Sequence, residues 1–340
     1  MKSVKIFSYF TVIILFFVSC DKRQSSSTTN DCNIELVDSV ILENTDILKP
    51  YEIFIQDSLC FFSVSHSFNH VSILNLNKQE TTHLFEKGNA PNQMIHYRRL
   101  NDNGSNKFKC VDMDRKIFYT IDDDMNVKED FRISNDIPHI FNVSQLNDSI
   151  IITTGAFTQG RILCYNKKSG TYSYHLNYPE TDKTKEISQL HKSILYNGTI
   201  IESNIEGNRF VLIDNGFLDF YVCKEDSFML ANSYRYHEKV FNCHPSRHII
   251  TYDKESIVGF FSVSSDDKYV YLCYSNETYK NTLMKERVIF SNTIMIYDWN
   301  GNFIRKCTLK RPISGIYCKR HQLWGLSSYG EFLYKFKLNN

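Results

Sequence analysis

A strand–turn–strand unit recurs along this chain at nearly constant spacing, and it constrains the fold more than any other feature. Each copy is a short run of apolar and aromatic residues, a polar turn and a second such run. Leu76, Ile121 and Tyr165 occupy equivalent points of three copies, which gives steps of 45 and 44 residues. Later copies, around Val222 and Tyr297, lie farther apart because longer connections separate them. A repeat of about 40–45 residues built from short strands is typical of a β-propeller blade.

Six copies of this unit fit between residue 49 and the end of the chain. The expected blades cover residues 49–90, 91–137, 138–180, 187–238, 254–311 and 312–340. The last copy offers only three strands, whereas residues 33–42 read as a strand without a local partner. We therefore predict an all-β, six-bladed β-propeller whose last blade is closed by the N-terminal strand, an arrangement that removes two exposed sheet edges. Seven blades and two stacked β-sandwiches remain open alternatives at this point.

Composition and turn chemistry agree with strands. The chain has 25 Phe and 21 Tyr but only 6 Pro, and aromatic side chains suit a half-buried pleated surface. The clearest hairpin covers residues 292–309, "NTIMIYDWNGNFIRKCTL". Its Asn300 and Gly301 are the pair that a two-residue type I′ turn prefers, because that turn needs two positive φ angles.

The N-terminus reads as a secretory signal peptide over residues 1–19. Lys2 and Lys5 precede an apolar stretch of thirteen residues, 6–18, which is shorter than the about 20 residues of a membrane span. Val18, Ser19 and Cys20 then resemble the bacterial lipoprotein signal motif, with Phe17 in place of the usual leucine. An ordinary secretory peptide with an incidental cysteine is the alternative.

The lipoprotein resemblance implies that Cys20 carries a diacylglycerol and becomes the mature N-terminus. Residues 21–30 contain no apolar side chain, so we predict a lipidated flexible tether over residues 20–32 and a propeller over 33–340. The protein would then reach the membrane through this lipid anchor.

Two further segments carry a more specific resemblance. They are "LFEKGNAPNQM", after the first blade, and "FFSVSSDDKYVYLCY", which precedes the hairpin above. With the leader and the six irregular blades, they make the chain similar to the TolB-like six-bladed propeller lipoproteins of Bacteroidetes. In that family the first segment is a glycine-rich turn, G-x-G-P. Gly88 and Pro91 keep its first glycine and its proline, and Ala90 replaces the second glycine.

The resemblance implies a protein of the cell envelope, in a family whose activity is mostly unassigned. Surface export of such lipoproteins is signalled by acids directly after the lipidated cysteine. This chain has Asp21, Lys22, Arg23 and Gln24 there. We therefore expect a lipid anchor in the outer membrane, on the periplasmic side rather than the cell surface.

Cysteine usage points to free thiols. With Cys20 lipidated, nine cysteines remain, an odd number. Cys110, Cys164, Cys223 and Cys273 lie inside strand-like runs, where a thiol behaves as a small buried apolar group. A domain of this size needs no disulfide framework.

Two histidine-containing segments are weak metal candidates. "CHPSRH" brings Cys243, His244 and His248 together between the fourth and fifth blades, but a structural zinc site normally has four ligands. His66 and His70 are four residues apart, which is a ligand spacing only on a helix, and we expect a solvated loop there. We predict neither a metal site nor a cofactor.

Two other motifs resemble catalytic or metal-binding patterns only in part. Asp122, Asp123 and Asp124 lack the alternate spacing and the distal Glu of a calcium loop, so a hairpin turn is expected. Ser327 follows Gly325 as in a G-x-S-x-G elbow, but Tyr329 replaces the second glycine, and the segment reads equally well as a strand and turn.

Charge and motif content leave two function classes. Lys+Arg 39 against Asp+Glu 38 gives no electrostatic case for nucleic acid. The first hypothesis is a monomeric, non-enzymatic binding or scaffolding propeller for an envelope protein, peptide or glycan, because rigid blades present many variable loops. The alternative is a propeller enzyme, such as a metal-dependent lactonase or hydrolase or a lyase, whose carboxylates and histidines converge at the central channel.

Overall fold

The computed structural model describes residues 31–43, 45–90, 93–101, 107–122, 124–204, 206–224, 227–285, 289–319 and 322–338. The predicted signal peptide, Cys20 and the tether up to residue 30 lie outside these ranges, as do Pro91 and Asp123. No helix within the described ranges has the length and apolar character needed to cross a membrane.

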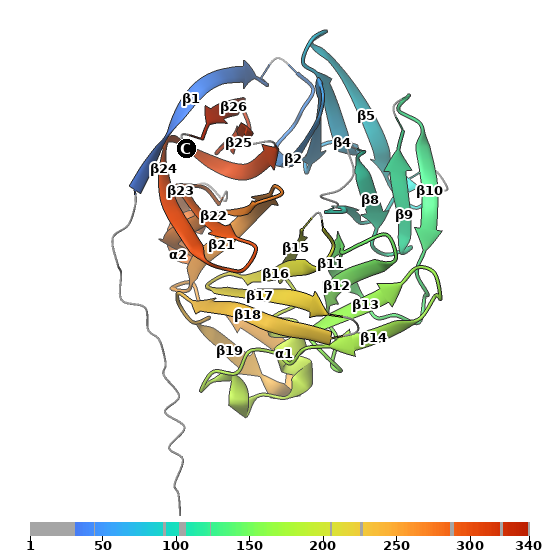
Figure 1. Ribbon diagram of the computed structural model, residues 1–340, viewed down its shortest axis with the longest axis vertical. Helices are drawn as coiled ribbons and strands as arrows, with labels where there is room; N and C mark the ends of the chain where they lie inside the picture. The colour runs from blue at the N-terminus through green and yellow to red at the C-terminus, as the bar shows by residue number, and fades with distance from the viewer. Residues whose placement is uncertain are drawn as a thin grey trace, which may run out of the picture. The chain divides into compact units, whose positions relative to one another are not determined.

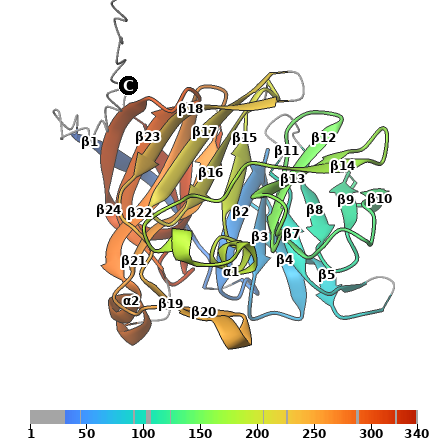
Figure 2. The same ribbon diagram turned by 90° about the horizontal axis from the view of Figure 1, so that it is seen from below.

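Antiparallel blades stand side by side around a central axis, as Figures 1 and 2 show. Blades 1 to 4 are separate sheets, and their strands run in chain order from the channel outward. Blade 1 consists of β2 (Pro50–Gln56), β3 (Leu59–Val64), β4 (Asn69–Asn75) and β5 (Glu80–Lys87), with the short β6 (Gln93–Met94) added at its edge. Blade 2 consists of β7 (Tyr97–Arg99), β8 (Lys109–Asp112), β9 (Ile117–Ile121) and β10 (Val127–Arg132). Blade 3 consists of β11 (Ile140–Gln145), β12 (Ile150–Gly155), β13 (Ile162–Asn166) and β14 (Tyr172–His175). Blade 4 consists of β15 (Ile200–Ser203), β16 (Arg209–Asp214), β17 (Phe217–Lys224) and β18 (Ser227–Arg235).

Blades 5 and 6 are merged into one seven-stranded sheet. Its seven strands are β21 (Ile257–Ser265), β22 (Tyr269–Thr278), β23 (Ser291–Asp298), β24 (Phe303–Lys319), β25 (Gln322–Ser327), β26 (Phe332–Lys337) and β1 (Asp31–Ile41). The first half of β24 is the outer strand of blade 5, and its second half is the inner strand of blade 6. Pro312 lies at this passage, where a strand tolerates the missing N–H.

The N-terminal strand closes the ring, as predicted. From Glu35 to Ile41, β1 pairs antiparallel with β26 and becomes the outer strand of blade 6. The sequence does not reveal a second pairing, in which residues 31–34 run parallel to residues 306–309 of β24 in blade 5. The strand β1 therefore pairs with both blade 5 and blade 6, and Figure 1 shows it beside both.

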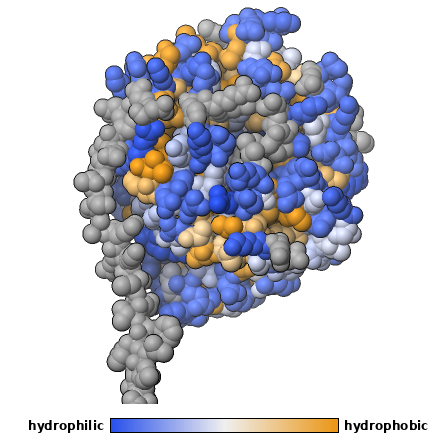
Figure 3. Space-filling model, in the orientation of Figure 1, coloured by the Kyte–Doolittle hydropathy of each residue, from blue (hydrophilic) through white to orange (hydrophobic). Residues whose placement is uncertain are grey.

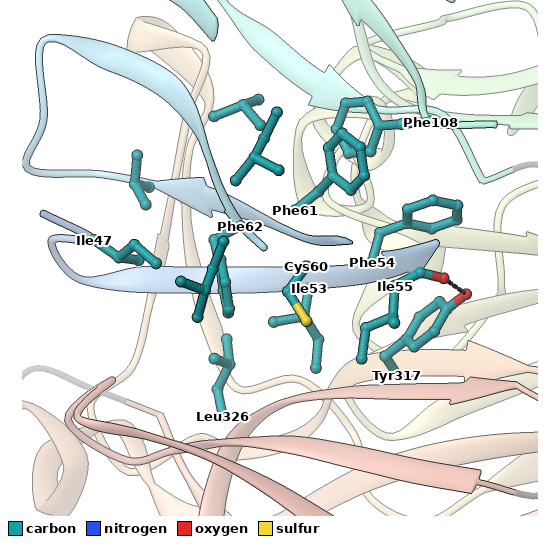
Figure 4. Close-up of a cluster of buried hydrophobic side chains, with 14 of the residues drawn as sticks. Ile47, Ile53, Phe54, Ile55, Cys60, Phe61, Phe62, Phe108, Tyr317 and Leu326 are labelled. Atoms are coloured by element: carbon teal, nitrogen blue, oxygen red, sulfur yellow. Dashed lines mark hydrogen bonds between the residues drawn. The ribbon is translucent and has the colours of Figure 1, made fainter. Parts of the chain in front are cut away.

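Apolar packing joins the last blade to the first. Phe54, Phe61 and Phe62 of blade 1 belong to one buried cluster with Tyr317 and Leu326 of blade 6 (Figure 4). The Tyr317 hydroxyl donates a hydrogen bond of 3.0 Å to the Ile55 carbonyl oxygen of the neighbouring blade. We call this interface the closure join.

Ion pairs surround Asp219 and Asp214 of blade 4, and one of them, Arg161 with Asp219, joins blade 3 to blade 4. Asp219 on β17 accepts from Arg161 at 2.5 Å and from Arg235 at 2.7 Å, and Asp214 on β16 pairs with Lys239 at 2.6 Å. The side chains of Arg161, Asp219, Asp214 and Lys239 are all almost fully buried. Burial alone would raise the pKa of Asp219, but Arg161 and Arg235 outweigh it and hold that pKa below its ordinary value. We call these five residues the charged join.

Short helices and one additional hairpin are inserted in the connections between strands. The segment η1 (Thr184–Glu186) and helix α1 (Gln189–Leu195) lie between blades 3 and 4. The hairpin of β19 (Phe241–His244), η2 (Pro245–Arg247) and β20 (Ile249–Tyr252) lies between blades 4 and 5, and α2 (Tyr279–Lys285) follows β22. Lys239 Nζ and the Tyr252 hydroxyl both donate to the Leu195 carbonyl oxygen, so the charged join also holds α1 and this hairpin.

The outer hairpins use one turn chemistry. Asn75, Asn166 and Asp298 each end the third strand of a blade, and Asp122 directly follows one. Each side-chain oxygen accepts a backbone N–H two residues later. Asp122 therefore belongs to a hairpin turn, as predicted.

The prediction of a type I′ turn at residues 300 and 301 is wrong. Gly301 has a φ of 80°, but Asn300 is not among the residues with positive φ. Asp298 and Asn302 flank a three-residue loop, and the Gly301 N–H donates to the Asp298 carbonyl oxygen at 3.0 Å. The Asp298 side chain binds the N–H groups of Asn300 and Asn302, which stabilises a type I turn followed by a left-handed glycine.

The cysteines with described side chains are all free thiols, in agreement with the sequence. Cys110, Cys164 and Cys273 are buried, whereas Cys223 is only half-buried. Burial raises the pKa of Cys60 and Cys164 to about 12, so these thiols stay protonated at neutral pH.

Candidate ligand-binding hollow at the channel mouth

A hollow of about 850 Å³ opens at one end of the central channel. All six innermost strands contribute to its wall, together with the loops that follow β3 and β25. Figure 3 shows a surface on which hydrophobic residues form several small, separate patches among hydrophilic ones. Patches of that kind do not identify an interface, so the hollow is the stronger candidate for a functional site.

Three cationic side chains line the side of the hollow formed by blades 1 and 2. Lys49 directly precedes β2, and Arg98 and Arg99 are consecutive residues of β7. None of the three forms an ion pair with another described residue. This side of the hollow therefore carries three cations and one carboxylate, Glu52, and none of the cations is paired with a described residue.

Arg99 lies over aromatic side chains. Its guanidinium carbon is 5.9 Å from the centre of the Phe54 ring. Its charge also acts on Tyr317 of blade 6, where burial raises the hydroxyl's pKa to about 12 and Arg99 opposes that rise. The Arg99 Nε is buried and has no hydrogen-bond partner among the described residues. A buried donor without an acceptor is unfavourable unless something else satisfies it.

The hollow contains one carboxylate and one imidazole. Glu52 accepts a hydrogen bond of 2.9 Å from the Ser63 hydroxyl, which in turn lies 3.1 Å from the Tyr97 hydroxyl. His66 is exposed in the loop after β3, and its Nδ1 lies 2.9 Å from the Ser65 hydroxyl. Acid–base catalysis at a propeller channel would need such groups to converge from several blades, whereas both of these belong to blade 1.

The wall contributed by blades 3 to 6 is mainly apolar, with Asn142, Ser262 and Ser314 between the apolar residues. Blades 3 to 6 contribute to it the side chains of Phe141, Val143, Ile200, Ile201, Phe261, Val263 and Ile316. Asn142 Nδ2 donates to the Thr199 carbonyl oxygen at 3.1 Å, and Asn101 Nδ2 donates to the Ile201 carbonyl oxygen at 3.1 Å. The first hydrogen bond joins blade 3 to the neighbouring blade 4, and the second joins the segment after β7 of blade 2 to blade 4.

The weak metal candidates do not lie in the hollow. Cys243 and His244 are adjacent on β19, so their side chains point to opposite faces of the hairpin. His248 follows η2 with a left-handed φ of 51°, and its ring is 5.7 Å from that of His191. Across the described part of the chain, no three His, Cys, Asp or Glu side chains gather as metal ligands would.

The other residues that the sequence analysis singled out lie partly on the wall of the hollow and partly in strands and turns away from it. His66 lies in a loop as predicted, but the loop prediction is wrong for His70, which is buried on β4 and has its Nε2 3.0 Å from the Met94 carbonyl oxygen. Ser327 ends β25 and accepts the Phe332 N–H at 3.0 Å, so it belongs to a strand and turn. Gly88 has a φ of 153°, and a Cβ there would lie 2.0 Å from Gln93 Oε1, which explains why glycine is needed in this turn.

The sequence analysis missed the three cationic residues. The available signal was the pair Arg98 and Arg99 in the segment "MIHYRRL". Both faces of an innermost propeller strand adjoin other blades, so two consecutive charged residues there are unusual. Lys49 gave no signal of its own.

Comparison with known proteins places this architecture in a family. The family model for TolB-like 6-blade propeller-like proteins matches residues 32–320. The chain belongs to this family. No curated protein matches this TolB-like propeller in sequence.

Solved structures agree with the TolB-like fold at low sequence identity. A protein of Bacteroides fragilis NCTC 9343, named as a candidate exported protein, is 12% identical with a TM-score of 0.58, covering 93% of this chain and 98% of its own. A protein of unknown function from Bacteroides thetaiotaomicron VPI-5482 is 8% identical with a TM-score of 0.54, and the match covers 90% of this chain and 75% of that protein. Virginiamycin B lyase from Staphylococcus aureus is 12% identical, and the match covers 90% of this chain and 100% of the lyase. Its TM-score of 0.48 is too low to support a comparison of function.

Proposed function

We propose that this TolB-like propeller is a non-enzymatic binding or scaffolding protein of the cell envelope, and that the hollow is its binding site. The partner would be an envelope protein, a peptide or a glycan. The observation that carries the proposal is the hollow itself, where three cationic side chains without ion pairs among the described residues surround a preformed cavity. Rigid blades and hydrogen-bonded inner strands hold such a site ready for a ligand, which lowers the entropic cost of binding.

The enzyme alternative has less support. A metal-dependent lactonase, hydrolase or lyase needs several carboxylates or imidazoles from different blades at one point. The hollow offers Glu52 and His66, both from blade 1. No observation on the wall of the hollow favours a specific reaction over binding.

Photochemical crosslinking in the intact envelope tests the binding proposal. The photoreactive residue p-benzoylphenylalanine would be placed at Tyr329, which lines the hollow, and in a separate control at Tyr172, which is exposed on the outer strand of blade 3. We expect a discrete adduct from position 329 and none from position 172. Equal crosslinking from the two positions, or none from either, would contradict binding at the hollow.

The proposed location rests on the lipoprotein signal. We propose that Cys20 carries the lipid and anchors the propeller in the outer membrane on the periplasmic side. Replacing Cys20 with Ala should release the protein from the membrane fraction and abolish labelling with palmitate. A C20A variant that still labels and sediments with membranes would overturn the anchor. Protease added to intact cells should leave the wild-type protein uncut if it faces the periplasm.

A further inference from the structure

We infer that the part of the partner that enters the hollow is a carboxylate on an apolar body. This inference rests on the proposed binding function and adds the chemical class of the ligand. It follows from how charge, aromatic surface and apolar surface are separated on the wall of the hollow.

The charge of the wall calls for an anion. Lys49, Arg98 and Arg99 face the hollow, and within the described ranges none of them has an ionic partner. The single carboxylate, Glu52, already accepts the Ser63 hydroxyl. A partly desolvated cation without a counter-ion is unfavourable, so an anionic group of a ligand gains a charge-assisted hydrogen bond there.

Arg99 is the best-placed anchor for that group. Its guanidinium carbon lies 5.9 Å from the centre of the Phe54 ring, and its buried Nε has no hydrogen-bond partner among the described residues. The planar fork of an arginine matches the two oxygens of a carboxylate. Arg98 and Lys49 lie on the same side of the hollow and would add long-range attraction.

The other wall selects the rest of the ligand. Phe141, Phe261 and Ile316 line the hollow from blades 3, 5 and 6, none of which contributes a cation to the wall. An apolar body gains from burial on this side, whereas a heavily hydrated anion such as free phosphate gains nothing from it. The volume of about 850 Å³ lies within the range of pockets that hold small organic ligands, about 300–1,000 Å³.

Ligand-observed NMR on the purified full-length protein in detergent tests this inference with a matched pair of probes. The probes are 4-phenylbutyrate and the neutral 4-phenylbutan-1-ol, with inorganic phosphate as a competitor. We expect the carboxylate to bind at least about tenfold more tightly than the alcohol, the typical effect of one charge-assisted hydrogen bond. Arg99→Gln should remove this preference. Arg132→Gln, an exposed arginine on the outer strand of the same blade, should keep it.

Each outcome decides the matter. Equal binding of the alcohol and the carboxylate, or an unchanged preference in Arg99→Gln, would overturn the inference, as would phosphate that competes as well as phenylbutyrate. If Arg99→Gln does not fold, Arg98→Gln replaces it and should give a smaller loss of the same sign. A neutral glycan crosslinked at position 329, with no preference for phenylbutyrate, would overturn the carboxylate and leave the proposed binding function standing. No adduct at position 329 and no probe binding would contradict both.

Discussion

The closure join and the charged join solve the same problem, holding one blade against the next, by opposite physical means. At the closure join, Tyr317 and Ile55 are 262 residues apart in sequence, and the contact is a continuous apolar cluster with one hydrogen bond. At the charged join, Arg161 and Asp219 are 58 residues apart, and their buried ion pair makes the contact between the blades. Apolar burial is non-directional and tolerates small misfits, whereas a buried ion pair demands one geometry.

This difference matches what each join holds in place. The closure join brings together the two ends of the propeller, where any well-packed apolar surface suffices. The charged join holds Leu195 of α1 and Tyr252 of the β19–β20 hairpin through Lys239, so its directional bonds fix inserted elements that no sheet supports. The comparison predicts that the two joins respond differently to truncation, to conservative substitution and to pH.

The largest effect should come from removing the strand that completes the ring. Deleting residues 21–42 takes away β1 and Leu42, including the buried Ile34 and Leu42 side chains, each 1% exposed. Loss of one such side chain costs about 2–5 kcal/mol, and the deletion also exposes the edge of β26. We expect the melting temperature to fall by at least about 10 °C.

Deleting only residues 21–30 is the matched control, because the sequence predicts a tether there. Calorimetry or circular dichroism follows both variants. A deletion through residue 42 that melts at the wild-type temperature would show that the ring does not depend on β1.

The second prediction compares the two joins directly by denaturant unfolding. Asp219→Asn should lower the free energy of unfolding by about 3–5 kcal/mol, because Arg161 stays buried without its anion. Ile53→Val in the closure join should cost about 0.5–1.5 kcal/mol. Asp148→Asn, an exposed control in blade 3, should stay within about 0.5 kcal/mol of wild type. If Asp219→Asn costs no more than Ile53→Val, the contrast between the joins fails.

The third prediction uses pH to separate the joins. Although burial opposes it, the pKa of Asp219 is held below its ordinary value of about 3.9 by Arg161 and Arg235. A depressed carboxyl pKa stabilises the fold fully above the ordinary value, and this stability is lost as pH falls through the folded pKa. The difference in unfolding free energy between wild type and Asp219→Asn should therefore stay constant down to about pH 5 and shrink as the pH falls below about 4. A difference that stays constant or grows below about pH 4 would contradict this account.

How far the sequence predicts the molecule depends on whether a feature is local. The positions of the outer hairpins were predictable because Asp122 and Asp298 fix their turns through contacts within a few residues, although the turn type after Asp298 was not. Closure by the N-terminal strand followed from counting strands. The second pairing of β1 did not, because no local feature of residues 31–34 indicates that they lie beside residues 306–309 of blade 5.

The candidate site was less predictable because it is assembled from every blade. Lys49 and Arg99 come from different blades, and only the closed ring brings them to one cavity. The charged join was equally hidden, since Arg161 and Asp219 look like ordinary polar residues until their burial is known. In a propeller, local sequence predicts the blade, whereas the channel and the joins depend on contacts between blades.

The smallest effect should come from the tip of the β19–β20 hairpin, which tests how far the charged join extends. Tyr252, at the end of the hairpin, bonds to Leu195. Cys243, His244 and His248 lie nearer the turn of the hairpin, and His244 and His248 are exposed. Replacing all three with Ala should change the free energy of unfolding by less than about 1 kcal/mol, because none of them takes part in the charged join. We also expect the purified protein to hold no stoichiometric zinc or calcium, which elemental mass spectrometry measures directly. One equivalent of metal that is lost in the triple variant would contradict this and make the hairpin a metal site. A large loss of stability without metal would instead extend the charged join to the tip of the hairpin.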